Sequence, residues 1–281
     1  MRPFLIMRDR NGHEVAICNE AARTKRKVLI LPKAATAAEY YKKAYEILYF
    51  MSFFYAAENF IIPSFEDREM YEQIGQDWVA DLRAGKFDQA YWDEFASHKL
   101  TPTRGNEIQF SVSSEAILWV PQKLVTNGLC GVTAEQQSLF PEFFWFMEEK
   151  EKVMFQHYNK VTDKPAVDEL LQKHPSYAPG VTENPDLLGL RGVSHEMYIN
   201  LLSKVKGCVG IAGTHTWEML TLFPEKPQII LYNKAGVERW DQIEKAYQKQ
   251  GFPVRCCGFE DGTDKEAFSM DVAEVFIKLF K

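Results

Sequence analysis

Residues 208–216 read Cys-Val-Gly-Ile-Ala-Gly-Thr-His-Thr, a short apolar run that ends in a glycine-led turn. A continuous apolar run of this length predicts a strand buried on both faces, as in a parallel sheet. The glycine and the threonines after it predict a tight turn into a helix that continues through residue 223. This stretch therefore predicts a strand–turn–helix unit of an α/β protein.

The same alternation of short apolar runs and helical patterns continues on both sides of this unit. We expect further strands over residues 187–193, 227–232 and 253–257, and further helices over 194–205, 240–250 and 266–280. Strands that alternate with helices through short links form right-handed βαβ units and a parallel sheet. The C-terminal part, residues 187–281, is therefore predicted to be a Rossmann-like lobe.

The N-terminal part is less regular and very aromatic. Asn11-Gly12 between two β-rich runs predicts a hairpin over residues 4–18. A helix over residues 36–59 has tyrosine or phenylalanine every fourth residue and is apolar nearly all round, so it is expected to be deeply packed. We also expect a strand over residues 28–32, before this helix. After the helix we expect strands over 60–63 and within 108–120, and helices over 66–96 and 135–158.

Five prolines or glycines in residues 162–186 mark the predicted connection between two lobes. The chain then divides into an aromatic-rich, largely helical N-terminal α/β lobe, residues 1–161, the connection, and the C-terminal lobe, residues 187–281. A chain of 281 residues with 46% hydrophobic and 26% charged residues has the size and composition of about two globular domains, or of one large α/β domain.

Charge and hydropathy exclude several classes of partner. With 33 basic and 39 acidic residues the net charge is −6, whereas proteins that bind nucleic acid usually carry a basic surplus.

The longest apolar run, residues 47–57, is too short for a bilayer, so no transmembrane segment is expected, and the N-terminus lacks a signal-peptide pattern. Five cysteines without metal-ligand spacing indicate free thiols in a reducing cytoplasm. Peripheral membrane contact and a homo-oligomer stay open.

The turn at Gly213, Thr214, His215 and Thr216 is the most promising candidate site. Ligands of open parallel sheets bind beyond the carboxyl ends of the strands, and a helix N-terminus offers unpaired amides and a positive dipole end to a diphosphate. The alternative is plain helix capping by Thr214. A second turn of this kind ends at Ser194, which could cap the helix after it or contact the same anion.

Residues 188–233 resemble the C-terminal half of a GT-B glycosyltransferase, most of all the heptosyltransferase-type lipopolysaccharide enzymes. The matching pieces are residues 198–204, the strand 208–212, the turn Gly213-Thr214-His215, the helix 217–223 and the strand 226–232. The resemblance implies a two-lobed GT-B fold and a nucleotide-sugar substrate whose diphosphate is held by Gly213, Thr214, His215 and Thr216. It implies transfer to a glycan or related acceptor without metal or other cofactor. The sequence has no Asp-x-Asp and no His-Glu-x-x-His pattern.

Such a transfer needs a general base for the acceptor hydroxyl, and in this fold the base faces the donor from the N-terminal lobe. The candidates are Asp9 and His13 on the predicted hairpin and Glu115 near a strand; each could equally be a surface or turn residue. Lys33 and Lys234 each follow a predicted strand and could contact phosphate, or be ordinary solvated lysines.

Two other functions remain open. The chain could be a non-catalytic binding or assembly protein on a degenerate GT-B-like frame, or another nucleotide-handling α/β enzyme. Two reactive-looking side chains, Cys208 and Trp217, are predicted to belong to the core.

Overall fold

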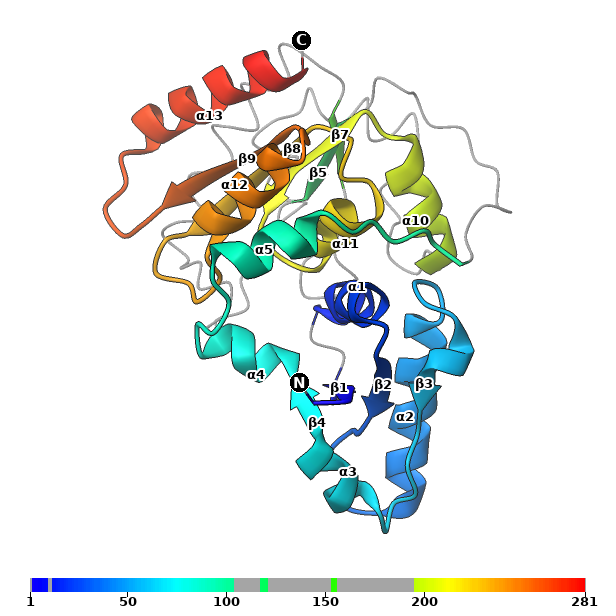
Figure 1. Ribbon diagram of the computed structural model, residues 1–281. Coiled ribbons are helices and arrows are strands. Elements are labelled where there is room, and N and C mark those ends of the chain that lie inside the picture. Colours follow the sequence, from blue (N-terminus) through cyan, green and yellow to red (C-terminus); the bar gives the residue numbers. More distant parts are fainter. Residues whose placement is uncertain (1, 10–11, 104–116, 121–152, 156–194, 281) are drawn as a thin grey trace.

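The computed structural model describes residues 2–9, 12–103, 117–120, 153–155 and 195–280, and they form an α/β protein with two parallel sheets (Figure 1). The first sheet has the order β3 (Phe60–Ile61), β2 (Lys27–Ile30), β1 (Phe4–Met7), β4 (Gly75–Asp77). The second has the order β6 (Val153–Phe155), β5 (Ile117–Val120), β7 (Gly207–Ile211), β8 (Gln228–Asn233), β9 (Val254–Phe259). The predicted α/β class is confirmed.

Helices connect the strands in both parts. In residues 2–103, called here the N-terminal half, they are α1 (Glu14–Thr24), α2 (Ala37–Met51), the 3-10 turn η1 (Ala57–Asn59), α3 (Arg68–Ile74), α4 (Trp78–Arg83) and α5 (Gln89–Ala96). In residues 195–280, the C-terminal half, they are α10 (His195–Lys204), α11 (Thr214–Leu222), α12 (Trp240–Lys249) and α13 (Lys265–Phe280).

The predicted alternation of the C-terminal half is confirmed from α10 to α13, with boundaries within two residues of those expected. Strand β7, which contains most of the apolar run predicted over residues 208–212, is buried along its whole length and lies between β5 and β8. Burial on both faces is what a continuous apolar run predicts, because no alternation is needed where neither face meets water. The strand predicted over residues 187–193 lies outside the described residues.

The predicted hairpin over residues 4–18 is wrong. The first run forms β1, which pairs in parallel with β2 and β4, and the second run forms the start of helix α1. Residues 14–21 are all buried, so their apolar run has no exposed face whose spacing would distinguish a helix from a strand. These residues form a helix because the surrounding elements pack against them on every side.

The aromatic helix also differs from expectation. It ends at Met51, and Thr36 caps it by accepting a hydrogen bond from the Glu39 amide. Tyr45 and Tyr49 are each 62% exposed, so the helix is not packed all round as predicted. The strand β4 interrupts the predicted helical region, and residues 153–155 form β6 where a helix was expected. The rest of residues 135–158 lies outside the described part.

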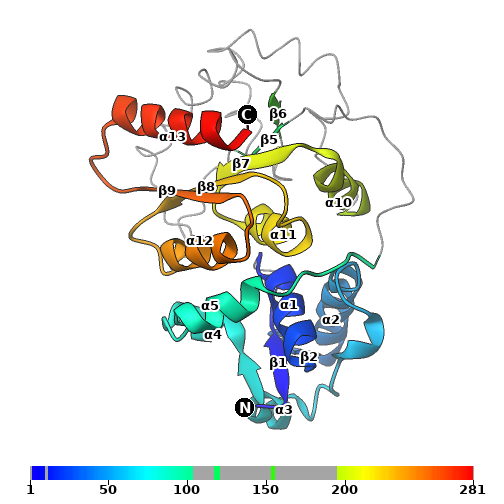
Figure 2. The same cartoon turned by 45° about the horizontal axis from the view of Figure 1, so that its top comes forward.

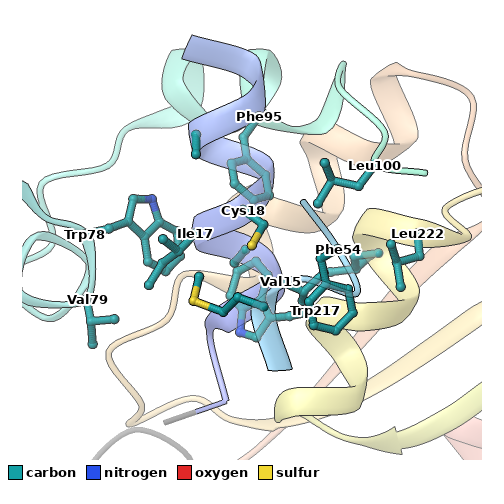
Figure 3. Close-up of a cluster of buried hydrophobic side chains, with 14 of the residues drawn as sticks. Val15, Ile17, Cys18, Phe54, Trp78, Val79, Phe95, Leu100, Trp217 and Leu222 are labelled. Atoms are coloured by element: carbon teal, nitrogen blue, oxygen red, sulfur yellow. The ribbon is translucent and has the colours of Figure 1, made fainter. Parts of the chain in front are cut away.

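Four helices fill the space between the two sheets, α1 and α5 from the N-terminal half and α11 and α12 from the C-terminal half (Figures 1 and 2). Helix α1 packs against α11, and α5 packs against α12. One buried hydrophobic cluster includes side chains of both halves, and Figure 3 shows members from α1, α4, α5 and α11 together. The two halves therefore share a core, which fixes how the loops at their facing ends meet.

None of the described helices is long and apolar enough to cross a membrane.

Candidate functional site

The loops that follow β1 and β7 touch each other. Strand β1 ends at Met7 and α1 begins at Glu14, while β7 ends at Ile211 and α11 begins at Thr214. Gly12 lies so close to Thr214 that a Cβ placed on the glycine would be 2.5 Å from the threonine Oγ1. The carboxyl end of a strand in each sheet therefore leads to the same region, which is where parallel sheets bind ligands.

Gly12 is held there by two separate constraints, and alanine should violate both. Its φ of +90° is in the region that L residues avoid, and the alanine methyl would overlap the Thr214 hydroxyl. We expect Gly12→Ala to lower the free energy of unfolding by about 2–4 kcal/mol, the sum of a positive-φ cost and an overpacking cost. Gly251→Ala is the matched control, because Gly251 has φ +84° and nothing within 4 Å of an added Cβ. Urea denaturation of both variants separates the cost of the clash with Thr214 from the cost of the backbone strain. Equal losses of unfolding free energy in the two variants would contradict the close contact between Gly12 and Thr214.

His13, the next residue, pairs with a carboxylate of the other half. Its Nε2 lies 2.9 Å from Oε1 of Glu238, a residue 225 positions away in the connection between β8 and α12. Both side chains are 4% exposed. The centroid of the His13 ring is 5.9 Å from that of the Trp78 indole and 6.0 Å from that of the Trp217 indole, and the two indoles are themselves 6.0 Å apart. This places one of the three predicted base candidates at the meeting point of the halves.

Glu238 was not among the residues predicted for the site. One signal could have found it: it is an acidic residue between a parallel strand and a helix, at the carboxyl end of β8. Nothing local distinguishes it from the exposed acidic residues nearby, such as Glu260 and Asp261. Its burial results from the N-terminal half packing over it, which the sequence of residues 234–239 does not encode.

The first turn of α11 is stabilised from within. The Gly213 amide donates to the Thr216 Oγ1 at 3.1 Å, and this hydroxyl also lies 3.2 Å from the His215 Nε2. The capping threonine is thus Thr216, not Thr214 as the capping interpretation expected. His215 and Thr216 are each 2% exposed, whereas Gly213 and Thr214 are half-buried. Of the four predicted diphosphate ligands, only Gly213 and Thr214 reach solvent in this arrangement.

His215 is uncharged at neutral pH. Burial lowers its pKa from 6.5 to about 3, and its Nδ1 has no hydrogen-bond partner within the described part of the chain. A neutral ring can donate a hydrogen bond to a phosphate oxygen but cannot contribute a full positive charge to the site.

This burial predicts a specific pH dependence of stability. Below pH 6.5 the unfolded chain protonates His215 and the folded chain does not, so the free energy of unfolding should fall as the pH drops. Between about pH 6.5 and pH 4.5 the loss from this group should be about 2 kcal/mol. His215→Gln, which cannot titrate, should show a correspondingly flatter profile in urea titrations across this range. Parallel profiles for the two proteins would contradict the buried, neutral state of His215.

Three other predicted site residues, Asp9, Lys33 and Lys234, lie on the surface. Asp9 and Lys33 are exposed, and the Lys33 carbonyl accepts a hydrogen bond from the Lys43 ammonium at 2.9 Å. Lys234 is half-exposed and pairs with Glu260 at 3.3 Å. Ser194 and Glu115 lie outside the described residues. The predicted roles of these five residues in binding or catalysis stay predictions.

Two predictions of a structural role are confirmed. Cys208 is buried within β7, and burial raises the pKa of its thiol, which makes it unreactive. Trp217 is buried in the shared core. Within the described ranges, no three His, Cys, Asp or Glu side chains lie close enough together to hold a metal ion.

No protein-family model matches the chain, and no curated protein matches it.

Proposed function

We propose that this protein is a metal-independent glycosyltransferase of two-lobed GT-B architecture, which moves a sugar from a nucleotide-diphosphate donor to a glycan or related acceptor. One observation carries the proposal: the loop with the candidate base, at Gly12-His13, lies against the candidate diphosphate turn at Gly213-Thr214. His13 is one of three predicted base candidates, it lies some 200 residues from the turn along the chain, and a transferase needs the base and the diphosphate site side by side.

In the proposed reaction, the diphosphate of the donor binds at the first turn of α11. The Thr214 hydroxyl and the first backbone amides of α11 face its oxygens, and the positive end of the helix dipole stabilises the negative charge. This electrostatic stabilisation of the leaving group is what a divalent metal supplies in other transferases. Helix α11 has nine residues, which is long enough for its peptide dipoles to produce such a positive N-terminal end.

His13 acts from the other half. As the acceptor hydroxyl oxygen attacks the anomeric carbon, its proton passes to the imidazole. The bond between the anomeric carbon and the diphosphate oxygen breaks, and its electron pair leaves on the diphosphate. The protein thus gains one proton for each sugar transferred and returns it to solvent before the next cycle.

Entry of a donor requires the contact between Gly12 and Thr214 to open. In the present arrangement Thr214 is covered in part by Gly12, and the next two residues of the turn are buried. The burial of His215 and Thr216 also favours the second candidate function, a non-catalytic binding or assembly protein whose α11 terminus serves only to cap a helix.

Titration calorimetry with a panel of nucleoside diphosphates tests the proposal. At least one should bind, and Thr214→Ala should weaken it about tenfold or more, since a hydrogen bond to a charged group contributes about 1.5–3 kcal/mol. His13→Gln should leave this binding within about twofold and abolish transfer from the matching nucleotide-sugar. Ser97→Ala is the control, because it removes an exposed hydroxyl at the end of α5. Failure of every nucleotide to bind would exclude the transferase, and binding without transfer would favour the assembly protein.

A further inference from the structure

One edge of the first sheet, where its strands begin, carries exposed cations. Because the strands are parallel, their amino ends meet at this edge, and the register sets Lys27 of β2 directly beside Phe4 of β1. Arg2 lies two residues before Phe4, and Lys25 lies two residues before Lys27. All three cations are exposed, and neighbouring strands are only about 4.8 Å apart. The register therefore brings three positive charges close together.

Arg83 adds a fourth charge from the end of α4. The side chain of Gln76 in β4 donates a hydrogen bond to the Asp81 carboxylate at 2.7 Å, which holds the last turn of α4 beside the beginning of β4. Arg83, two residues after Asp81, is exposed. The four cations thus come from separate segments spread along one edge of the sheet. We call them the basic edge: Arg2, Lys25, Lys27 and Arg83.

The other charges nearby neutralise one another. They form ion pairs of 2.7–2.9 Å: Arg23 and Arg26 with Glu20, Arg23 with Glu94, and Lys86 with Asp81. Within the described residues, no ion pair involves a member of the basic edge. Glu58, just before β3, is exposed at the same edge and offsets one of its cations. A chain with a net charge of −6 therefore presents a local positive surplus here.

Exposed apolar side chains lie next to these cations. Met70 and Ile74, one turn apart on α3, are 55% and 38% exposed. Ile74 immediately precedes Gly75, whose carbonyl accepts a hydrogen bond from the Arg2 guanidinium. Cations with exposed apolar residues beside them suit an anionic lipid surface, because the cations meet the headgroup charges and the apolar side chains enter the boundary of the acyl chains.

We propose that the basic edge, together with Met70 and Ile74, docks on a bilayer that contains anionic lipid. A bilayer is favoured over nucleic acid because the two apolar side chains gain nothing from a phosphate backbone, and the net charge of −6 opposes contact with a long polyanion. Arg2 precedes β1 and Gly12 follows it, so the docking surface and the candidate site lie at opposite ends of this strand. The proposal therefore does not depend on the transferase reaction.

Cosedimentation of the full-length protein with sucrose-loaded vesicles tests the proposal. Vesicles with about one-third phosphatidylserine should bind the protein at least about tenfold more tightly than phosphatidylcholine alone, and high salt should remove most of the difference. Each cation near an anionic surface strengthens binding about fivefold, so Lys25→Gln/Lys27→Gln should weaken it about 20-fold or more. Lys42→Gln/Lys278→Gln is the matched control, because it removes the same charge from exposed positions on α2 and α13 and should weaken binding less than about threefold.

A further variant separates a bilayer from other anionic partners. Met70→Ser/Ile74→Ser should weaken vesicle binding about threefold or more and leave binding to heparin, a polyanion without an apolar layer, unchanged. Equal binding to neutral and anionic vesicles, no binding to either, or the same loss in the Lys42→Gln/Lys278→Gln control would overturn the proposal. Full vesicle binding by the Met70→Ser/Ile74→Ser variant would also overturn it, since the contact would then be that of a general polyanion site.

Discussion

Replacing His13 with alanine is expected to lower the free energy of unfolding by about 3–5 kcal/mol, because it leaves the Glu238 carboxylate buried without its partner. Both side chains are almost fully buried, so water cannot replace the lost hydrogen bond without opening the contact between the halves. Urea denaturation followed by tryptophan fluorescence measures the loss, since the indole centroids of Trp78 and Trp217 lie 5.9 and 6.0 Å from that of the His13 ring.

A double-mutant cycle isolates the pair. Glu238→Ala alone leaves a neutral imidazole, which is cheaper to bury than a charge, and should cost about 1–3 kcal/mol. The double variant should be less destabilised than the sum of the single variants by at least about 1 kcal/mol, because neither partner is then left unpaired. Strictly additive losses, or a loss below about 1 kcal/mol for His13→Ala, would contradict the buried hydrogen bond between the two side chains.

Trp217→Ala should be similarly costly, at about 3–5 kcal/mol, because it empties the centre of the shared core. The indole projects from α11 into the cluster of Figure 3. Ring centroids 5.2–6.2 Å away belong to residues of both halves: His13, Trp78, Trp92, Phe95 and Trp240. Its Nε1 has no hydrogen-bond partner within the described residues, so packing accounts for its contribution.

Thermal and urea unfolding of Trp217→Ala give the measurement, and Tyr45→Ala is the control. Tyr45 is 62% exposed, so its loss should change the free energy of unfolding by less than about 0.5 kcal/mol. Trp217→Phe keeps an aromatic ring in the cavity and should recover much of the loss. If Trp217→Ala unfolds in two transitions, the halves are held together chiefly by this side chain; a loss as small as that of Tyr45→Ala would contradict its central position.

The candidate site shows where prediction from sequence is limited. His13 and the turn at Gly213–Thr216 were identified because each is a chemical group next to a predicted strand end, which is a local signal. Glu238 also follows a strand end, but it was not predicted, because only its burial distinguishes it from other acidic residues in such positions. Conversely, His215 was an attractive ligand by residue type, and burial now makes it neutral and largely inaccessible.

The sequence by itself determined the strands and helices of the C-terminal half, because apolar runs, glycine turns and helical spacing are properties of neighbouring residues. The tertiary structure alone decided that residues 14–24 form a helix and that His13 meets Glu238 across 225 positions. Both outcomes depend on what the other half of the molecule buries. Burial is a property of the whole packed core, and no local pattern of residues carries it.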